Sequence, residues 1–365
     1  MAIKGAAIVG AGPAGLTVAR ELALHDIPVT VYEGKKNVID DTEKASGIIS
    51  INGLESLGID YHPAIVNDLW GAVLHAGTEE LRVRSKKRIA HVVSRAKLAQ
   101  IMYKAAVAAG AEIKMGRRLD RESIRGLDSE VIIGADGAVS NVASAFGFPE
   151  IKEYVLTYKA EYEGVPKPED ETMVELFFQK EAQRLFGWTV PYGGTNMEVG
   201  IGITKKAKVT SSAAFESFFK ASLMERMGKA RQVSGLASII PLEPRRRTVS
   251  GKVLLVGDAA GQVKATTGGG IVFGSMCSRV AADVIVGHFT KGRDLMLYES
   301  AWRRKYGNEL KMHSVMHEYY SIAGEKGLER FFKLAKILGA ERFLSEYGDM
   351  DRPGVMLRRL FTRRK

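Results

Sequence analysis

The feature that most constrains this chain is a glycine-rich segment near its start, Gly10-Ala11-Gly12-Pro13-Ala14-Gly15. The apolar run Ala6 to Val9 precedes it, and apolar residues at helical spacing follow it. The pattern predicts a strand that turns tightly into a helix. Gly10 permits the turn, Gly12 lets backbone N–H groups approach a pyrophosphate, and Gly15 lets the helix pack on the strand. We therefore expect a Rossmann-type dinucleotide-binding domain.

A second predicted strand, Pro28 to Tyr32, ends just before Glu33. A carboxylate at this spacing accepts hydrogen bonds from the hydroxyls of the adenosine ribose. It also disfavours a 2′-phosphate, which argues against NADP in this site. This part of the sequence does not separate FAD from NAD.

A second glycine-bearing region lies in the carboxyl half of the chain. The strand-like run Lys252 to Val256 ends in Gly257-Asp258-Ala259-Ala260-Gly261, and Thr266-Thr267-Gly268-Gly269-Gly270-Ile271 begins nine residues after Gly257. The two glycine regions together indicate FAD rather than a nicotinamide dinucleotide.

Length and composition predict a globular protein of two interleaved domains, because 365 residues with 45% apolar content can bury a large core. The single cysteine, Cys277, excludes an intrachain disulfide and a multi-cysteine metal site. It lies in an apolar helical stretch, so we expect a buried thiol. We expect no metal, no signal peptide and no membrane span, and a cytoplasmic location.

The net charge of +11 is spread over several basic clusters, and their spacing indicates no nucleic-acid module. The terminal residues Arg358 to Lys365 combine cations with the apolar residues Leu360 and Phe361. Such a segment suits peripheral contact with an acidic membrane surface, with an ordinary charged terminus as the alternative.

The order of predicted elements indicates an α/β fold, α+β overall, with a mostly parallel sheet, an antiparallel-sheet substrate domain and a helical C-terminal region. Ser94 is expected to cap a helix that ends at Gly110. We expect Leu328, Phe331, Phe332, Ala335 and Leu338 to form a core-facing stripe. The predicted domains are 1–70, 90–150 and 245–292 for FAD, 71–89 and 151–244 for substrate, and 293–365 for the C-terminal helices.

Taken in order, these segments resemble the flavoprotein superfamily that includes the aromatic-ring hydroxylases and the geranylgeranyl reductases. The resemblance spans roughly residues 1–290 and is more specific than any single motif. The segments that carry it are Gly10 to Gly15, Glu33, Arg95, Gly134 to Gly137, Gly257 to Gly261 and Thr267 to Ile271.

The resemblance implies FAD as cofactor and a role for each matching residue. Asp258 would bind the ribityl hydroxyls, Arg95 would meet the phosphate and ribose region, and Asp136 would hold the nucleotide-binding turn. The helix beginning near Ile271 would direct its positive end at the flavin. The implied FAD-binding residues are Gly10, Gly12, Pro13, Ala14, Gly15, Glu33, Lys44, Ser46, Gly47, Arg95, Asp136, Asp258, Gly261, Gly268, Gly269, Gly270 and Ile271.

Two details favour the reductases over the hydroxylases. Ala259-Ala260-Gly261 stands where hydroxylases usually have Ala-Ala-His and a proline, and there is no proline between Gly261 and Gly268. The segment 186–191, Phe-Gly-Trp-Thr-Val-Pro, resembles the reductases' aromatic-x-Trp-x-Phe-Pro substrate motif. Residues two apart share one face of a strand, so its aromatic rings would form an apolar wall, with ordinary sheet core as the alternative. The implied substrate-binding residues are Phe186, Trp188, Pro191 and Tyr192.

One departure concerns the segment Lys44-Ala45-Ser46-Gly47, which stands where many of these reductases have Lys-Pro-Cys-Gly. Any chemistry that depends on that cysteine is absent here. We assign no catalytic residue; Tyr192 is a candidate proton donor, with a surface turn residue as the alternative.

The resemblance implies an FAD-dependent reductase of isoprenoid carbon–carbon double bonds, such as those of geranylgeranyl chains on a lipid precursor. Reduced flavin N5 would deliver hydride to the alkene. Two alternatives stay open: an FAD-dependent monooxygenase, and a flavin-binding partner in lipid synthesis with no turnover of its own. Because the chain has one dinucleotide fingerprint, the expected electron donor is transiently bound NAD(P)H or a small electron carrier.

Overall fold

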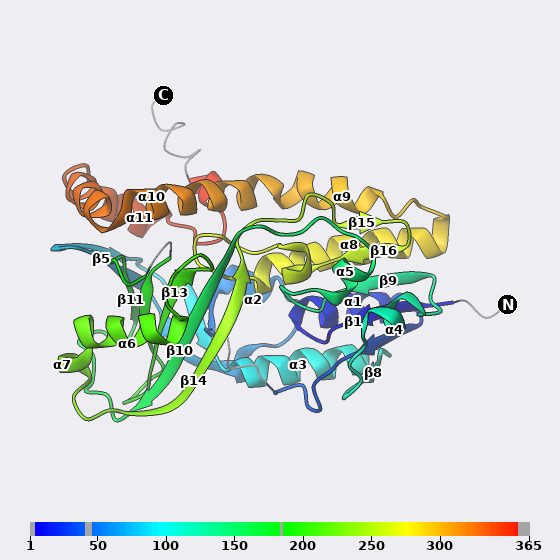
Figure 1. The fold of residues 1–365 in the computed structure, drawn as a ribbon, viewed down its shortest axis with the longest axis horizontal. Coiled ribbons are helices and arrows are strands. Elements are labelled where there is room, and N and C mark those ends of the chain that lie inside the picture. Colours follow the sequence, from blue (N-terminus) through cyan, green and yellow to red (C-terminus); the bar gives the residue numbers. More distant parts are fainter. Residues whose placement is uncertain (1–3, 41–45, 183–184, 357–365) are drawn as a thin grey trace.

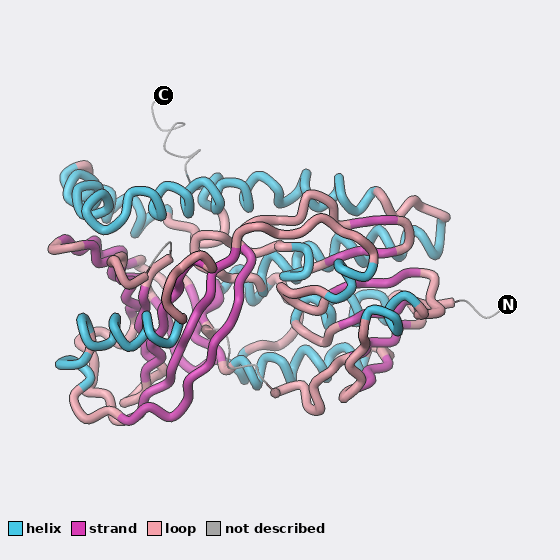
Figure 2. The backbone as a smooth tube through the Cα atoms, viewed as in Figure 1, coloured by secondary structure: helices cyan, strands magenta, loops and turns pink. Residues whose placement is uncertain are grey.

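A computed structural model describes residues 4–40, 46–182 and 185–356. Three sheets organise the fold (Figures 1 and 2). A six-stranded sheet and a seven-stranded sheet lie side by side, and long helices run along one edge of both. Two segments named above, Lys44 and Arg358 to Lys365, lie outside the described residues.

The six-stranded sheet is the predicted mostly parallel sheet. Its order is β15-β16-β9-β1-β2-β8, and each neighbouring pair from β16 to β8 is parallel, whereas β15 pairs antiparallel with β16. The strands are β1 (Ala6–Val9), β2 (Val29–Tyr32), β8 (Glu112–Lys114), β9 (Val131–Gly134), β15 (Val249–Ser250) and β16 (Val253–Leu255).

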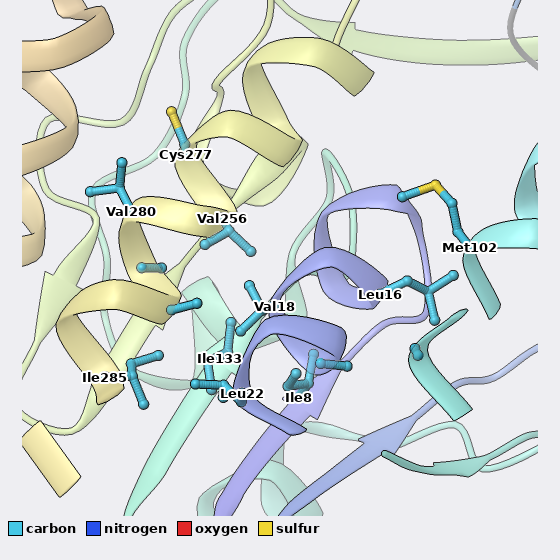
Figure 3. Close-up of a cluster of buried hydrophobic side chains, with 14 of the residues drawn as sticks. Ile8, Leu16, Val18, Leu22, Met102, Ile133, Val256, Cys277, Val280 and Ile285 are labelled. Atoms are coloured by element: carbon cyan, nitrogen blue, oxygen red, sulfur yellow. The ribbon is translucent and has the colours of Figure 1, made fainter. Parts of the chain in front are cut away.

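Both faces of this sheet are covered, which explains its continuous apolar strands. Every residue of β1 and β9 is buried. Ile8 and Ile133 point into a core formed with the helices α1 (Pro13–Ala23), α3 (Arg95–Ala108) and α8 (Ile271–Lys291). The neighbouring Val9 and Ile132 point into a smaller core formed with α4 (Arg121–Arg125) and α5 (Asn141–Ala145). Figure 3 shows the larger core, in which Ile8 and Ile133 lie beside residues of α1 and α8.

Three helices of this region, α1, α3 and α8, begin where the sequence predicts. In α3, the Ser94 hydroxyl accepts from the backbone N–H of Lys97 at 3.3 Å, which confirms the predicted cap. Cys277 of α8 is fully buried, as predicted, and burial raises the pKa of its thiol. The helices are α1 (Pro13–Ala23), α2 (Ile51–Glu55), α3 (Arg95–Ala108), α4 (Arg121–Arg125), α5 (Asn141–Ala145) and α8 (Ile271–Lys291).

Helix α8 is long and apolar enough to cross a bilayer, but 67% of its most apolar 18-residue window is buried inside the protein. It packs against α1 and carries Phe273, Ala281 and Ile285 into the larger core. Its apolarity is therefore accounted for by core packing.

The seven-stranded sheet has the order β14-β10-β13-β12-β11-β5-β6. The sequence predicts an antiparallel sheet here, and all pairs are antiparallel except β11 with β5, which is parallel. The strands are β5 (Gly71–Ala76), β6 (Glu79–Arg84), β10 (Tyr154–Glu163), β11 (Met173–Phe177), β12 (Gly187–Pro191), β13 (Met197–Thr204) and β14 (Arg231–Pro241). Helices α6 (Ser211–Ser222) and α7 (Met224–Met227) follow β13, and α6 packs on β10 and β13.

A separate three-stranded sheet was not predicted. It pairs β3 (Ile48–Ser50), β7 (Ala90–Val93) and β4 (Ile65–Leu69) in antiparallel fashion, with the short helix η2 (His62–Ala64) between α2 and β4. The long strand β14 was also not predicted. The division into domains stays a prediction.

The C-terminal region is helical, as predicted, and comprises α9 (Leu297–Trp302), the π-helical turn η4 (Arg303–Gly307), α10 (Asn308–Ile337) and α11 (Ala340–Tyr347). Helix α10 bends at Gly324, where φ is 60°. The predicted core-facing stripe is wrong at two of its five residues: Leu328, Phe332 and Ala335 are buried, but Phe331 and Leu338 are 44% and 75% exposed. Helix α10 bends at Gly324 and lies at the edge of the fold, so Phe331 and Leu338 face solvent.

The ring of Phe218 in α6 tests how much the core under the seven-stranded sheet stabilises the fold. Phe218 is fully buried, and its ring lies 5.5 Å from that of Phe177. We expect Phe218→Ala to lower the free energy of unfolding by about 3–5 kcal/mol, because it leaves a cavity. The control Phe331→Ala, at an exposed ring, should stay within about 0.5 kcal/mol of wild type. Urea denaturation of both variants measures this, and equal midpoints would contradict the prediction.

Candidate functional site

A cavity of about 460 Å³ joins the two glycine regions to the seven-stranded sheet. One end is bounded by backbone from both glycine regions, together with Ser46, Arg95 and Asp258. The other end is bounded by side chains of the seven-stranded sheet and its neighbours, most of them apolar. The apolar lining comprises Leu69, Ala72, Val174, Leu176, Leu185, Phe186, Trp188, Val190 and Ile240.

The first glycine region forms the turn that its sequence predicts. A Cβ at Gly15 would lie 2.0 Å from the carbonyl oxygen of Gly10, so helix and strand approach at a distance that only glycine permits. A Cβ at Gly12 would meet no atom within 4 Å. Gly12 is the N-cap of α1, where no side chain caps the helix. Together with Pro13 and Ala14, Gly12 lines the cavity, so the positive end of α1 faces open space.

Glu33 lies beside this turn, at the end of β2. Its carboxylate accepts from the backbone N–H of Ala11 at 2.7 Å and from that of Lys35 at 2.9 Å. Glu33 is not one of the described residues that line the cavity. It holds the glycine turn, and its ribose-binding role stays a prediction.

The second glycine region follows β16 as the short helix η3 (Gly257–Ala260). Gly257 has φ +62°, and a Cβ there would lie 2.7 Å from the Cβ of Ala14. Burial raises the pKa of Asp258, while the Arg95 guanidinium acts in the opposite direction. Both residues line the cavity, which brings a carboxyl group and a guanidinium group from distant segments to its polar end.

The loop between η3 and α8 is closed by backbone hydrogen bonds to Lys264. Its carbonyl accepts from the N–H of Gly268 at 2.8 Å, and its own N–H donates to the carbonyl of Gly269 at 3.2 Å. Gly268 to Ile271 all line the cavity. Helix α8 begins at Ile271 without a side-chain cap, so a second helix N-terminus points toward the same space.

Several predicted residues lie behind the lining instead. Burial raises the pKa of Asp136, and its carboxylate accepts from the Ser140 hydroxyl at 2.6 Å and the Val142 N–H at 3.1 Å, so it anchors the start of α5. A Cβ at Gly261 would lie 2.1 Å from the carbonyl oxygen of Glu243. A Cβ at Gly47 would lie 2.1 Å from that of Val93. Gly261 and Gly47 therefore allow close backbone packing, and direct FAD contact by any of these three residues stays a prediction.

Ser46 shows a buried polar atom directed at the cavity. Its Oγ atom is buried, lines the cavity and has no hydrogen-bond partner among the described residues. A buried hydroxyl without a partner is costly unless a ligand supplies one. Ser46 therefore fits a polar ligand at this end of the cavity.

The aromatic segment of β12 forms one wall of the apolar end. Phe186 and Trp188 line the cavity, whereas Pro191 and Tyr192 are not among the lining residues. The Trp188 indole Nε1 donates to Glu198 at 2.8 Å. The Tyr192 hydroxyl donates to the other Glu198 oxygen at 3.2 Å. Tyr192 therefore supports the wall from behind, and its role as proton donor stays a prediction.

Glu198 is fully buried, and its charge is balanced by the buried Lys159, whose Nζ donates to it at 2.8 Å. This pair fixes the carboxylate that orients the Trp188 ring. Sequence reasoning missed both residues, because in β10 and β13 they look like the polar positions of an alternating strand.

Sequence reasoning also missed a buried ion pair at the cavity. Lys264 lines the cavity, and its Nζ donates to Asp351 Oδ1 at 2.6 Å. The Ser50 hydroxyl donates to the other Asp351 oxygen, and the neighbouring Met350 reaches the cavity lining. A signal for Lys264 existed, since it is the single charge between Gly261 and Ser278. Asp351 lies 87 residues away and carried no such signal.

These observations fit FAD. The open space at Gly12, two uncapped helix N-termini, the pair of Arg95 and Asp258 and the partnerless Ser46 hydroxyl together suit a diphosphate-bearing, hydroxyl-rich ligand. The site defines a flavin-dependent oxidoreductase.

The comparison with known families agrees. Residues 5–276 match the FAD binding domain family, so the chain belongs to that family and FAD is its cofactor. The predicted resemblance, fold class, enzyme class and cofactor are thereby confirmed. The chain is an FAD-dependent oxidoreductase that resembles the geranylgeranyl reductases.

Individual relatives point the same way. The chain is 27% identical over 350 residues to the digeranylgeranylglycerophospholipid reductase of Methanothrix thermoacetophila, covering 88% of this chain and 89% of the relative. A geranylgeranyl bacteriochlorophyll reductase-like protein from Thermoplasma acidophilum superposes with a TM-score of 0.82 at 18% identity, covering 91% of each chain. A flavin-dependent brominase superposes with a TM-score of 0.75 at 16% identity, covering 99% of this chain and 100% of the brominase. The two structures show a shared fold.

Gly12 allows a direct test of the phosphate site. Its backbone is extended, with φ −74° and ψ 177°, and a Cβ would point into open space, so Gly12→Val should fold like wild type. The added isopropyl group would occupy the space in front of α1. We expect the Kd for FAD to rise at least about tenfold, or about 1.4 kcal/mol, with a smaller rise for Gly12→Ala. Fluorescence titration of the apoproteins measures this; unchanged affinity in both variants would place the pyrophosphate elsewhere.

The Lys264–Asp351 pair supports a second prediction, on stability. Burial alone would raise the pKa of Asp351, but Lys264 and the Ser50 hydrogen bond outweigh burial and hold that pKa below its usual value. Lys264→Met leaves a buried carboxylate unpaired, so we expect a loss of about 3–5 kcal/mol in unfolding free energy. The double variant Lys264→Met/Asp351→Leu should recover most of it. Denaturation of all three proteins measures this, and an equally unstable double variant would refute it.

The same pair has a predictable pH dependence. A carboxyl with a lowered folded-state pKa stabilises the protein above its unfolded pKa, and this contribution disappears as the pH falls through the folded value. The difference in free energy of unfolding between wild type and Asp351→Asn should therefore be largest at neutral pH and should decrease below about pH 4.

Proposed function

We propose that the protein is an FAD-dependent reductase of prenyl lipids, which saturates isolated carbon–carbon double bonds of geranylgeranyl-type chains. The observation that carries this proposal is the single cavity with a polar end and an apolar end. The polar end fits FAD, and the apolar end offers an isoprenoid chain a wall of aliphatic and aromatic side chains. Relatives named as digeranylgeranylglycerophospholipid reductases add support.

Bound FAD supplies the hydride in its reduced form. The chain's own residues place the substrate and keep water away. Phe186 and Trp188 present an apolar surface, and Trp188 cannot rotate freely because Glu198 holds its indole N–H. Orientation of an otherwise unreactive alkene against the cofactor is the main contribution that such a wall can make.

The electrostatics of the polar end suit a cofactor that gains negative charge on reduction. The N-termini of α1 and α8 face the cavity, and Lys264 and Arg95 are the cations among its described lining residues. A helix N-terminus favours a nearby negative charge by about 0.3–1 kcal/mol when exposed. The two helix N-termini would favour the reduced cofactor, the state that donates hydride, whereas Asp351 and Asp258 offset the charges of Lys264 and Arg95.

The proposal extends to the electron donor and the location of the protein. The donor would be NAD(P)H bound briefly or a small electron carrier, because the chain has one dinucleotide fingerprint. The protein would work in the cytoplasm, in peripheral contact with the membrane that holds its lipid substrate.

Anaerobic turnover of the prereduced enzyme tests the reaction. On addition of a geranylgeranyl glycerophospholipid, the flavin absorbance should return and mass spectrometry should find two added hydrogens for each saturated bond. Oxygen-dependent NAD(P)H consumption with a hydroxylated product would show a monooxygenase. A flavin that binds but is not reoxidised by the lipid would show a partner without turnover.

Trp188 tests the site. The Trp188 ring would be covered by the bound substrate, and its removal should weaken the free energy of substrate binding by about 1.5–3 kcal/mol. Trp188→Ala should therefore raise KM for the prenyl lipid about 10- to 100-fold. The matched control is Trp70→Ala, because Leu69 and Gly71 line the cavity but Trp70 does not; it lies 5.9 Å from the Arg84 guanidinium. Equal KM values for the two variants would show that Trp188 does not contact the substrate.

A further inference from the structure

Helix α10 carries an unusual number of exposed large apolar side chains. Ile322, Ile337 and Leu338 are 76%, 75% and 75% exposed. The full set, which we call the α10 patch, is Val315, Met316, Tyr319, Ile322, Phe331, Leu334, Ile337 and Leu338. Single exposed apolar residues are ordinary, but a contiguous group marks a surface that another apolar phase covers.

The patch is continuous although the helix bends. Gly324 separates the first four residues from the last four. The ring of Tyr319 and the ring of Phe331 lie 5.8 Å apart, edge to face, across this bend. The two groups therefore meet at the edge of the molecule along which α10 runs (Figure 1).

The charges around the patch are mainly positive. Lys326, Arg330 and Lys333 are exposed and make no ion pair within the described residues. The acids of the same stretch hydrogen-bond to other segments: Glu325 accepts from the Lys180 N–H, and Glu329 accepts from Thr78. The Thr78 hydrogen bonds lower the pKa of the Glu329 carboxyl group, and Lys326 and Arg330 also lie close enough to help lower it. Exposed Glu318 remains as an acid before the bend. Apolar side chains interleaved with cations are typical of a helix that lies in the interface of an anionic bilayer.

The opposite side of α10 packs against the cavity's apolar end. Leu328, Phe332 and Ala335 belong to the same buried cluster as Leu185 and Phe186. Leu185 and Phe186 also line the cavity. The patch and the buried cluster that borders the cavity therefore lie on opposite sides of α10, with Phe178 between Phe332 and the cavity-lining Phe186.

We propose that the α10 patch seats the protein on the surface of an anionic lipid membrane. A second copy of the chain is disfavoured as the occupant, because a symmetric contact would press two faces together that each carry the exposed cations Lys326, Arg330 and Lys333. An anionic bilayer offers both an apolar layer and the opposite charge. The contact names a partner surface for the proposed function and would bring the apolar end of the cavity close to lipid.

Vesicle sedimentation with the full-length holoprotein tests this contact. Wild type should sediment with vesicles of phosphatidylcholine mixed with phosphatidylglycerol, less with phosphatidylcholine alone, and less as salt is raised. Ile322→Asp/Ile337→Asp should reduce the partition coefficient at least about tenfold, because each added charge opposes burial in the interface. The matched control is Leu24→Asp/Val139→Asp, at positions 55% and 74% exposed on the nucleotide-binding side, which should sediment like wild type.

Three results would overturn the proposal: wild type that stays in the supernatant, patch variants that bind vesicles as wild type does, and a wild-type dimer that the patch variants convert to monomer in light scattering. The flavin spectrum and melting temperature of each variant verify folding, since the substituted residues are exposed. Sedimentation needs no turnover, so it can succeed where lipid reduction fails. Conversely, reduction of a detergent-dispersed substrate by the patch variants would support the reductase independently of the membrane contact.

Discussion

The close approach of two helix N-termini at the carboxyl edge of the parallel sheet underlies the rest of the structure. Gly257 allows it: a Cβ there would lie 2.7 Å from the Cβ of Ala14, and a Cβ at Gly274 would lie 3.2 Å from the Cα of Gly257. A larger residue at Gly257 would push η3 away from α1, and one at Gly274 would press α8 against η3. Because both helices begin without side-chain caps at the cavity, this contact concentrates two positive helix ends on one ligand.

Buried charges support the site from both ends. Lys264 and Asp351 connect the loop before α8 to a segment near the C-terminus, and Ser50 adds β3 to the same cluster. Behind Trp188, Lys159 pairs with Glu198, which accepts from the indole N–H and so connects β10 and β13 to the cavity wall. A buried pair contributes little net stability compared with an apolar core, but it imposes one geometry, because each charge must face its partner. Both pairs therefore sit where the position of a cavity wall matters.

The sequence predicted the parallel sheet well and the other sheets only in part, for reasons that lie in burial. β1 and β9 are buried on both faces, which leaves a run of apolar residues that is visible in the sequence. β14 is an edge strand of mostly exposed or half-exposed residues interrupted by Gly235, so it lacked that signal. The parallel pairing of β11 with β5 joins segments about 100 residues apart and depends on packing rather than on a local pattern.

The sequence by itself determined the glycine turns, and with them the class of cofactor, because the steric demands of a tight turn and a close backbone approach are set within a few residues. The tertiary structure alone decided which distant side chains face one another. Asp351 reaches Lys264, Glu198 meets Trp188, and Phe331 turns outward beside Tyr319 because sheets and helices from separate parts of the chain pack in one particular arrangement. Such contacts depend on the whole fold, and a local pattern contains no record of them.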